Sequence, residues 1–353
     1  MKNSSLKYIL ISDFNMFGYI NGIPLFFKNT LDRLNFIPLT KNNLEDLRPD
    51  DIVVFLYPDW LDINNLNFTN DIKNYGAKII CIILDMMSFY STYNISRSVE
   101  ISFFNTFDFI ITQSDKMTDF LRDHNVVQPM VNLEIFDYPL PMSRELILTK
   151  LEVVKNKVLH LEKVDPVLVY AGKFDIRFRP WIFSPVLANV KLNVYSDTPV
   201  AAREIDFSRR ENVVFKGNFS MENIFENIDG NFSIIWNGLE DGVTIPIYGA
   251  SMSLFKTLSI SSKIDFSIVR LLPIICRKGT ADANLVEKLE IGISLNHLDE
   301  LENVLQKLPV STYKKYVENL FKIALNSSKG FYLEDALHKC ENFLSSDFIE
   351  KDD

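Results

Sequence analysis

The fold is indicated most clearly by the run KIICIIL, residues 78–84, which is apolar at every position after its first lysine. An apolar run of this length without alternation is typical of a strand that a parallel sheet buries on both faces. The first half of the chain contains three more such runs, which are YILIS (8–12), IVVFLY (52–57) and FDFIITQ (107–113). Segments with helical spacing separate them, and one of these begins with Ser114 as its expected N-cap. This alternation predicts a doubly wound α/β domain.

The second half of the chain repeats the scheme. Its strand-length runs are VLVYAG (167–172), KLNVYS (191–196), NVVFKGNF (212–219), FSIIWNG (232–238) and LPIICRKG (272–279). Helical patterns over 298–308 and 311–326 follow, and a last helix begins after Gly330. We therefore predict an N-terminal Rossmann-like domain over 1–145, an inter-domain connection over 146–165, a second Rossmann-like domain over 166–328, and a C-terminal helix over 329–353 that packs back on the first domain.

Composition limits the classes of function. The 353 residues are enough for two domains, and 47% hydrophobic residues can form substantial cores. A net charge of −9 argues against general binding of nucleic acid, which favours a basic face.

Cys81, Cys276 and Cys340 lie far apart, so we expect buried thiols in a reducing compartment. No window approaches the ~20 apolar residues of a membrane span, so we expect a cytoplasmic protein, with the inner face of the membrane as a further location.

Several signatures of catalysis are absent from the sequence. No GxGxxG motif follows a strand, and no P-loop, GxSxG or HExxH motif occurs. No Asp-x-Asp pair is present to hold Mg²⁺ or Mn²⁺, so we expect neither a metal site nor a cofactor. If phosphate is bound, side-chain cations and backbone N–H groups have to neutralise it.

Cations gather where such a site is expected. Ligands of open α/β sheets bind outside the carboxyl ends of the strands, and the strand at 167–171 ends at Gly172. The cations that follow or approach this edge are Lys173, Arg177, Arg179, Lys256 and Lys263. The two last lysines are seven residues apart and would share a face of one helix, where they could stabilise a leaving diphosphate without metal. The alternative is that the lysines are solvated and that the arginines pair with a nearby acid such as Asp175.

Several longer motifs occur in a fixed order. The second half contains WNGLEDGV, IYG and SSKIDFSIVRLLPIICRKGTADANLVEKLEIGISLNHLDEL, and it begins with LVYAGKF. The first half contains KIICIILDMMSFY, FDFIITQSDKMTDFL and LEIFDYPL. This series resembles a bacterial group of GT-B glycosyltransferases, which includes accessory glucosyltransferases of serine-rich adhesins and β-galactofuranosyltransferases of surface polysaccharides. The resemblance covers most of the chain and implies two Rossmann-like domains that face a cleft, with C-terminal helices.

The sequence departs from the pattern of this group at two places. The group carries His-Asp after the fourth strand, whereas this chain has Leu84-Asp85. The Asn-Pro-His that precedes the group's lysine is replaced by Ile260-Ser261-Ser262, although Lys263 itself is kept.

The resemblance implies a hexosyltransferase that moves a sugar from a nucleoside diphosphate donor to a hydroxyl of a glycan or glycoprotein. The expected donor is a UDP-sugar. Arg179 and Lys263 would then neutralise the diphosphate. Tyr195 would stack on the base or contact the ribose, and the loop that contains Asp241 and Gly242 would contact the donor sugar or ribose. On the other domain, Gly18 and Gly22 would let the loop over 12–24 approach phosphate, and Asp13 or Asp85 would act as the base of an inverting reaction. Each aspartate has a plain alternative as a helix cap or a solvated loop acid.

Two other functions fit the same residues. One is a catalytically silent GT-B subunit that serves as a scaffold or partner of an active glycosyltransferase, which the two departures favour. The other is a nucleotide-sugar enzyme without an acceptor, such as an epimerase. The expected partners are a nucleotide sugar and a carbohydrate or glycopeptide acceptor, with peripheral membrane association and self-association as further expectations.

Overall fold

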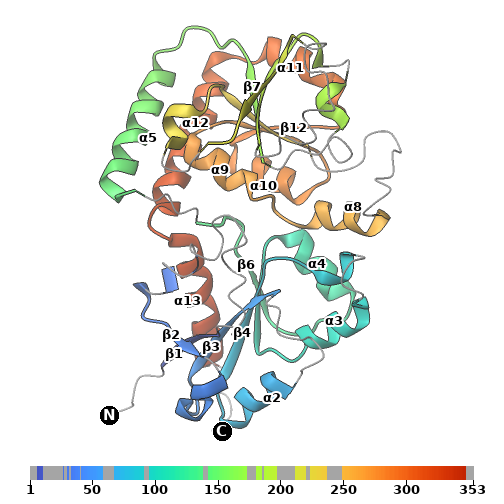
Figure 1. Cartoon of the computed structure of the whole chain (residues 1–353), viewed down its shortest axis with the longest axis vertical. Coiled ribbons are helices and arrows are strands. Elements are labelled where there is room, and N and C mark those ends of the chain that lie inside the picture. The colour runs from blue at the N-terminus through green and yellow to red at the C-terminus, as the bar shows by residue number, and fades with distance from the viewer. Residues whose placement is uncertain are drawn as a thin grey trace. The chain divides into compact units, whose positions relative to one another are not determined.

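The computed structural model describes residues 6–10, 27, 30–31, 33–39, 41–58, 67–90, 95–137, 142–172, 180–184, 187–196, 211–219, 223–236 and 249–346. The chain forms two compact units. The first is Met1–Pro139 together with Gly330–Asp353, and the second is Leu140–Lys329. Each unit contains a parallel sheet with helices packed on it (Figure 1).

The sheet of the first unit has six parallel strands in the order β2-β1-β3-β4-β5-β6. Their bounds are β1 Lys7–Leu10, β2 Ile37–Leu39, β3 Ile52–Tyr57, β4 Lys78–Ile83, β5 Phe109–Thr112 and β6 Met130–Asn132. All six residues of β3 are buried, as the unbroken apolar run predicts for a strand covered on both faces. The strand order reverses between β1 and β3, which is the switch point of this sheet.

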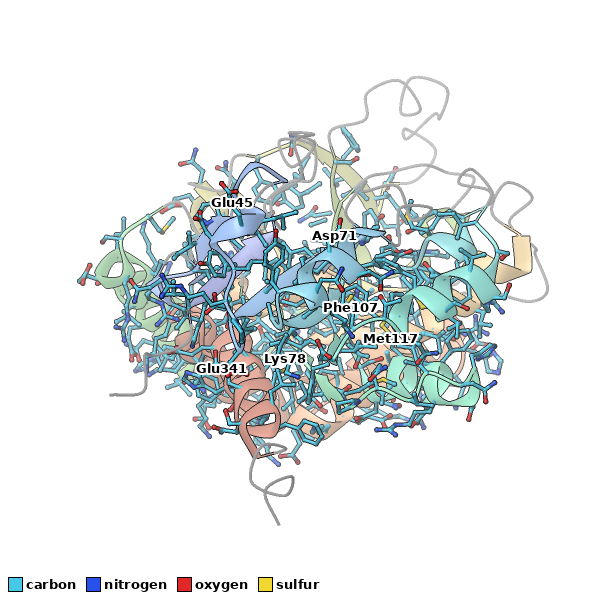
Figure 2. The ribbon with its side chains drawn as sticks, turned by 90° about the horizontal axis from the view of Figure 1, so that it is seen from below. Glu45, Asp71, Lys78, Phe107, Met117 and Glu341 are labelled. Carbon is cyan, nitrogen blue, oxygen red and sulfur yellow. The ribbon has the colours of Figure 1, made fainter. Side chains whose placement is uncertain are left out.

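Four α-helices with described bounds cover this sheet, namely α2 Asn67–Asn74, α3 Arg97–Phe104, α4 Asp115–Asp123 and α13 Phe331–Ser346. The strands lie between α13 and the pair α3 and α4 (Figure 1). Phe107 and Met117 are buried inside the unit, whereas Glu45 and Asp71 lie at its periphery (Figure 2). The predicted N-cap is confirmed, because the Ser114 side chain accepts a hydrogen bond from the Met117 N–H at 3.0 Å.

A buried carboxyl group fixes α13 to the first unit. Asp137 has no exposed surface, and its two oxygens accept hydrogen bonds from the backbone N–H groups of Tyr332 (3.1 Å) and Leu333 (2.8 Å) at the start of the helix. Further along α13, Glu341 forms an ion pair with Lys7 at 2.5 Å. Helix α13 is therefore part of the first unit, although it lies far from the rest of that unit in the sequence.

The sheet of the second unit has the order β12-β11-β10-β7-β8-β9. The strands are β7 Val167–Ala171, β8 Lys191–Tyr195, β9 Val213–Gly217, β10 Phe232–Ile235, β11 Ile274–Arg277 and β12 Gly292–Leu295. Counted from β7, this is the strand order 3-2-1-4-5-6 of dinucleotide-binding sheets, with its switch point between β7 and β10. The sequence therefore predicts the class of both sheets correctly.

The helices of the second unit are α5 Arg144–Leu159, α7 Ile224–Asn227, α8 Gly249–Leu258, α9 Lys263–Arg270, α10 Ala281–Leu289, α11 Leu301–Lys307 and α12 Val310–Ser327. The segment that we expected to connect the domains, 146–165, contains most of α5, which packs against α12 within this unit. The helices expected over 298–308 and 311–326 are confirmed as α11 with the short turn before it, and as α12. No helix of the described ranges is long and apolar enough to cross a membrane.

Candidate functional site

The carboxyl end of β7 forms the centre of the candidate site. Gly172 follows the strand directly and has φ +140°, a conformation that residues with a side chain rarely adopt. A Cβ atom at this position would lie 3.0 Å from Cε and 3.5 Å from Nζ of Lys263. The lysine side chain therefore extends across the glycine, and its ammonium group lies at the switch point of the second sheet.

The chain places Lys263 there by starting a new helix at this residue. The Ser261 N–H donates to Oδ1 of buried Asp282 at 2.8 Å, and the Ser261 carbonyl accepts from the Ile264 N–H at 2.8 Å. The Ser267 hydroxyl closes the first turn by donating to the Lys263 carbonyl at 2.6 Å. Asp282 belongs to the first turn of α10, so the start of α9 is fixed by the neighbouring helix.

These bonds correct one prediction. Lys256 and Lys263 do not share a face of one helix, because α8 ends at Leu258 and α9 begins only at Lys263. In a continuous helix the Ser261 N–H would donate to the carbonyl of residue 257, but Asp282 takes this N–H instead. Lys256 is half-exposed on α8, with its Nζ 5.5 Å from the ring centre of Phe255.

An aromatic ring lies beneath the ammonium group of Lys263. Nζ is 5.6 Å from the ring centre of Tyr170, which is a cation–π distance. Tyr170 is itself buried in β7 and packs edge-on against Trp181 with 5.8 Å between ring centres. Lys263 is thus half-buried, and its ammonium group lies over a packed aromatic ring at the edge of the sheet.

Tyr195 takes a different role from the one predicted. The residue is 4% exposed, and its hydroxyl donates to the Asn227 carbonyl at 3.0 Å and accepts from the Asp229 N–H at 2.8 Å. The hydroxyl group thus has both a donor and an acceptor partner inside the domain, and the side chain links β8 to the turn before β10. Its backbone carbonyl also accepts from the Gly172 N–H at 3.0 Å, which helps to hold the glycine turn.

In the first unit, Asp85 follows the carboxyl end of β4. Its Oδ1 accepts from the Met86 N–H at 3.0 Å, and its Oδ2 accepts a hydrogen bond from the Tyr90 hydroxyl. The preceding residue is also held, because the Gln113 side chain donates to the Leu84 carbonyl. The half-buried carboxylate is therefore oriented at the edge of the sheet where ligands of this fold class bind.

Sequence reasoning missed the residue that organises this loop. Glu100 has no exposed surface, and its carboxylate accepts from the Tyr57 hydroxyl (2.6 Å), the Met87 N–H (2.6 Å) and the Ser88 N–H (3.3 Å). Burial and the charge of Glu100 raise the pKa of Tyr57, which keeps the phenol protonated as a donor. A glutamate within the apolar pattern SVEISFF was the available signal.

The remaining predicted residues lie outside the described ranges. They are Asp13, Gly18, Gly22, Lys173, Arg177, Arg179, Asp241 and Gly242. Within the described ranges, no group of three His, Cys, Asp or Glu side chains is arranged to hold a metal ion. The three cysteines are buried and unpaired, and burial raises the pKa of Cys81, Cys276 and Cys340.

Two Rossmann-like domains with C-terminal helices define the GT-B class of glycosyltransferase fold, and solved structures of that class superimpose on the chain. HepE of Anabaena, determined in complex with UDP and glucose, matches with a TM-score of 0.54 at 13% identity over 91% of this chain and 89% of that one. Sucrose-phosphate synthase of Thermosynechococcus elongatus matches with a TM-score of 0.52 at 13% identity over 97% and 81%. Because the sequence identities are this low, the similarity to these structures shows a shared fold and nothing more.

The chain belongs to the glucosyltransferase 3-like family. The model of the family's N-terminal domain matches residues 27–135, and that of its C-terminal domain matches residues 168–340. Glucosyltransferase 3 of Streptococcus gordonii is 23% identical over 292 residues, which is 81% of this chain and 78% of that protein. The beta-1,6-galactofuranosyltransferase WbbI of Escherichia coli is 19% identical over 238 residues, 66% and 63% of the two chains. The resemblance identified from the motifs is confirmed, and the protein is a glycosyltransferase by family.

Proposed function

We propose that the protein transfers a hexose from a nucleoside diphosphate, and specifically from a UDP-sugar, to a carbohydrate hydroxyl. The observation that carries this proposal is the contact between Lys263 and Gly172 at the switch point of the second sheet. A cation held over a glycine turn suits a diphosphate, because the glycine lets phosphate oxygens approach the backbone while the lysine neutralises them. The match to HepE, whose structure contains UDP and glucose, supports the choice of donor.

We propose that side-chain cations, rather than a metal, stabilise the donor side of the reaction. As the bond between the anomeric carbon and the diphosphate oxygen breaks, negative charge grows on the diphosphate. Lys263 would stabilise this charge, and Lys173, Arg177 and Arg179, which follow Gly172 in the sequence, would add to it. We propose that no cofactor takes part and that the nucleotide sugar is a substrate.

The acceptor side needs a base if the reaction inverts the anomeric centre. We assign this role to Asp85, with Asp13 as the alternative. The carboxylate would take the proton of the acceptor hydroxyl while that oxygen attacks the anomeric carbon. Its orientation by the Tyr90 hydroxyl, in a loop that Glu100 fixes, supports the assignment.

The acceptor is proposed to be a glycan or glycoprotein, in the glycosylation of an adhesin or the assembly of a surface polysaccharide. The names of the relatives, a glucosyltransferase and a galactofuranosyltransferase, support transfer to a carbohydrate-bearing acceptor. We also propose that the protein associates peripherally with a membrane.

The test measures binding of UDP, GDP and ADP by calorimetry and thermal shift in the presence of EDTA. A ligand at about 100 times its Kd stabilises the folded protein by about 2.7 kcal/mol, which is readily measured. We expect UDP to bind and Lys263→Ala to weaken its affinity at least about tenfold, since a hydrogen bond to a charged group contributes ~1.5–3 kcal/mol. Lys307→Ala, an exposed lysine of the same unit in the last turn of α11, is the control and should bind UDP normally. UDP binding that Lys263→Ala leaves unchanged would refute the donor site.

A second candidate is a silent GT-B subunit. The observation in its favour is the replacement of the family-like His-Asp and Asn-Pro-His motifs by Leu84-Asp85 and Ile260-Ser261-Ser262. Release of UDP from UDP-sugars, with and without glycan acceptors, separates the two. Binding of UDP without turnover on any acceptor, together with co-purification of an active glycosyltransferase, would establish the silent role.

A further inference from the structure

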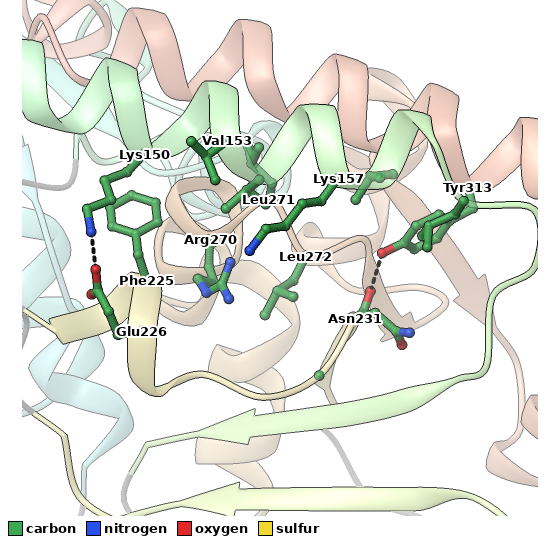
Figure 3. Close-up of a pocket in the computed structure, with 14 residues that line it drawn as sticks. Lys150, Val153, Lys157, Phe225, Glu226, Asn231, Arg270, Leu271, Leu272 and Tyr313 are labelled. Atoms are coloured by element: carbon green, nitrogen blue, oxygen red, sulfur yellow. Dashed lines mark hydrogen bonds and ion pairs between the residues drawn. The ribbon is translucent and has the colours of Figure 1, made fainter.

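A second cavity lies at the opposite edge of the sheet in the second unit. Its volume is about 530 Å³, and its walls come from α5, α7, the end of α9, α12 and the turns that precede β10 and β11 (Figure 3). Gly230 and Asn231 precede β10, and Leu271 and Leu272 precede β11, so the cavity is at the amino ends of these strands. Lys263 and Gly172 lie at the carboxyl end, and the cavity is therefore separate from the candidate donor site.

Two cations meet inside this cavity. Arg270 is the last residue of α9, and Lys157 on α5 points toward its guanidinium group (Figure 3). One nitrogen of Arg270, Nη2, donates to the Ile228 carbonyl at 3.0 Å, whereas its Nε is buried without a hydrogen-bond partner in the described part of the chain. Burial lowers the pKa of Arg270, although a guanidinium stays charged at any pH at which proteins fold.

The acid that lines the cavity is already paired. Glu226 accepts a hydrogen bond from Lys150 in an ion pair at one end of the cavity, and this pairing lowers the pKa of its carboxyl group. Among the described residues that line the cavity no other carboxylate is present. Glu226 alone therefore faces three cations, Lys150, Lys157 and Arg270, and the lining carries an excess of positive charge. Two like charges that face each other, one of them with an unused buried donor, indicate a place for an anion.

The remaining walls are largely apolar. Val153 on α5 and Leu161, just beyond the end of that helix, are 47% and 36% exposed, and both line the cavity beside buried Phe225 and Leu272. At the far end, the Tyr313 hydroxyl donates to the Asn231 carbonyl at 3.2 Å. A volume of this size falls within the range of roughly 300–1,000 Å³ found for small-molecule sites, which combine apolar walls with a few polar groups.

We propose that this cavity binds a small soluble phosphate monoester that carries an apolar group. Arg270 and Lys157 hold the phosphate through their charged side chains, and the apolar group packs against Val153 and Leu161. Arginine and lysine together match a dianion, because the guanidinium offers a planar pair of donors and the ammonium group adds a mobile point charge. No covalent step is involved.

Phenyl phosphate is the probe, titrated into the full-length protein at constant ionic strength and followed by calorimetry and by the methyl NMR signals of Val153 and Leu161. We expect saturable binding that shifts these signals, and phenol, which lacks the charge, to bind at least tenfold more weakly. Lys157→Glu should weaken binding of phenyl phosphate at least tenfold. Because Lys157 is exposed, this variant is expected to fold normally.

Two controls make the test specific. Lys307→Glu makes the same charge change at an exposed lysine in the last turn of another helix of the unit, and it should leave the affinity unchanged. Lys263→Ala should also leave it unchanged, which separates this cavity from the donor site. The proposal is overturned if phenyl phosphate does not bind, if Lys157→Glu has no effect, or if either control loses binding to the same degree.

Discussion

The buried carboxyl group of Asp137 makes the stability of the first unit depend on pH in an unusual direction. Two effects compete at this residue. Burial favours the neutral acid, whereas the two N–H groups at the start of α13 favour the carboxylate. Burial is the larger effect and raises the pKa of Asp137 from 3.8 to about 7.

A pKa raised from 3.8 to about 7 corresponds to about 4 kcal/mol of preference for the protonated form in the folded protein. Between these two pH values the folded chain binds a proton that the unfolded chain has lost. The contribution of Asp137 to the free energy of unfolding is therefore highest below about pH 4, and it falls as the pH rises to about 7. Most buried ion-paired acids show the opposite trend.

Asp137→Asn provides the perturbation, because asparagine keeps the shape and one acceptor oxygen but does not titrate. We expect the free energy of unfolding of wild type, minus that of the variant, to fall by up to about 4 kcal/mol between pH 4 and pH 8. Taking this difference removes the contributions of the other carboxylates, and urea unfolding at a series of pH values measures it. A ¹³C NMR titration of the Asp137 carboxyl carbon reports its pKa directly. A value below 4, with a difference independent of pH, would refute the reasoning and show that the helix N-terminus outweighs burial.

Two further predictions concern the candidate site. Gly172→Ala should weaken UDP binding and destabilise the fold by about 1–3 kcal/mol, because it strains the backbone and displaces Lys263. The control is Gly217→Ala, which is also at positive φ but has no atom within 4 Å of the added Cβ. It should retain its affinity for UDP in the same calorimetric titration. Glu100→Gln should cost about 1–3 kcal/mol in urea unfolding, since its amide would face an N–H donor of the 87–88 turn, and it should lower sugar transfer more than donor binding. Equal UDP affinities of the two glycine variants, or an unchanged turnover in Glu100→Gln, would contradict these predictions.

The parts of the fold that depend on local pattern could be predicted from the sequence. The run at 78–84 is apolar because β4 is covered on both faces, and five of the six residues of this strand are buried. Short strands at sheet edges carry much less signal. β2 has only three residues, of which two are exposed, and β12 follows α10 without a distinct apolar run. Neither could be found from periodicity.

Features that depend on distant residues could not be predicted. The break between α8 and α9 requires Asp282, which lies 21 residues beyond Ser261, and no local pattern reveals that bond. The same holds for Asp137, whose partners in α13 are 195 and 196 residues away. The lysine of the candidate site was identified from its motif, but the glycine that it crosses is 91 residues earlier in the chain. A spacing of seven residues suggested the wrong partner for Lys263, because spacing has meaning only within one continuous helix.

The position of α9 explains why one short helix can serve two sites. Six of its eight residues are buried, and the two that are partly exposed are the cations at its ends, Lys263 and Arg270. Seven residues of helix span about 10 Å, so the first cation lies at the carboxyl edge of the sheet and the last at the amino edge. Each ammonium or guanidinium group is fixed by different neighbours, Gly172 and Tyr170 for Lys263, and Ile228 for Arg270. Single substitutions at either end can therefore separate the donor site from the second cavity, while the buried face of the helix keeps both cations in place.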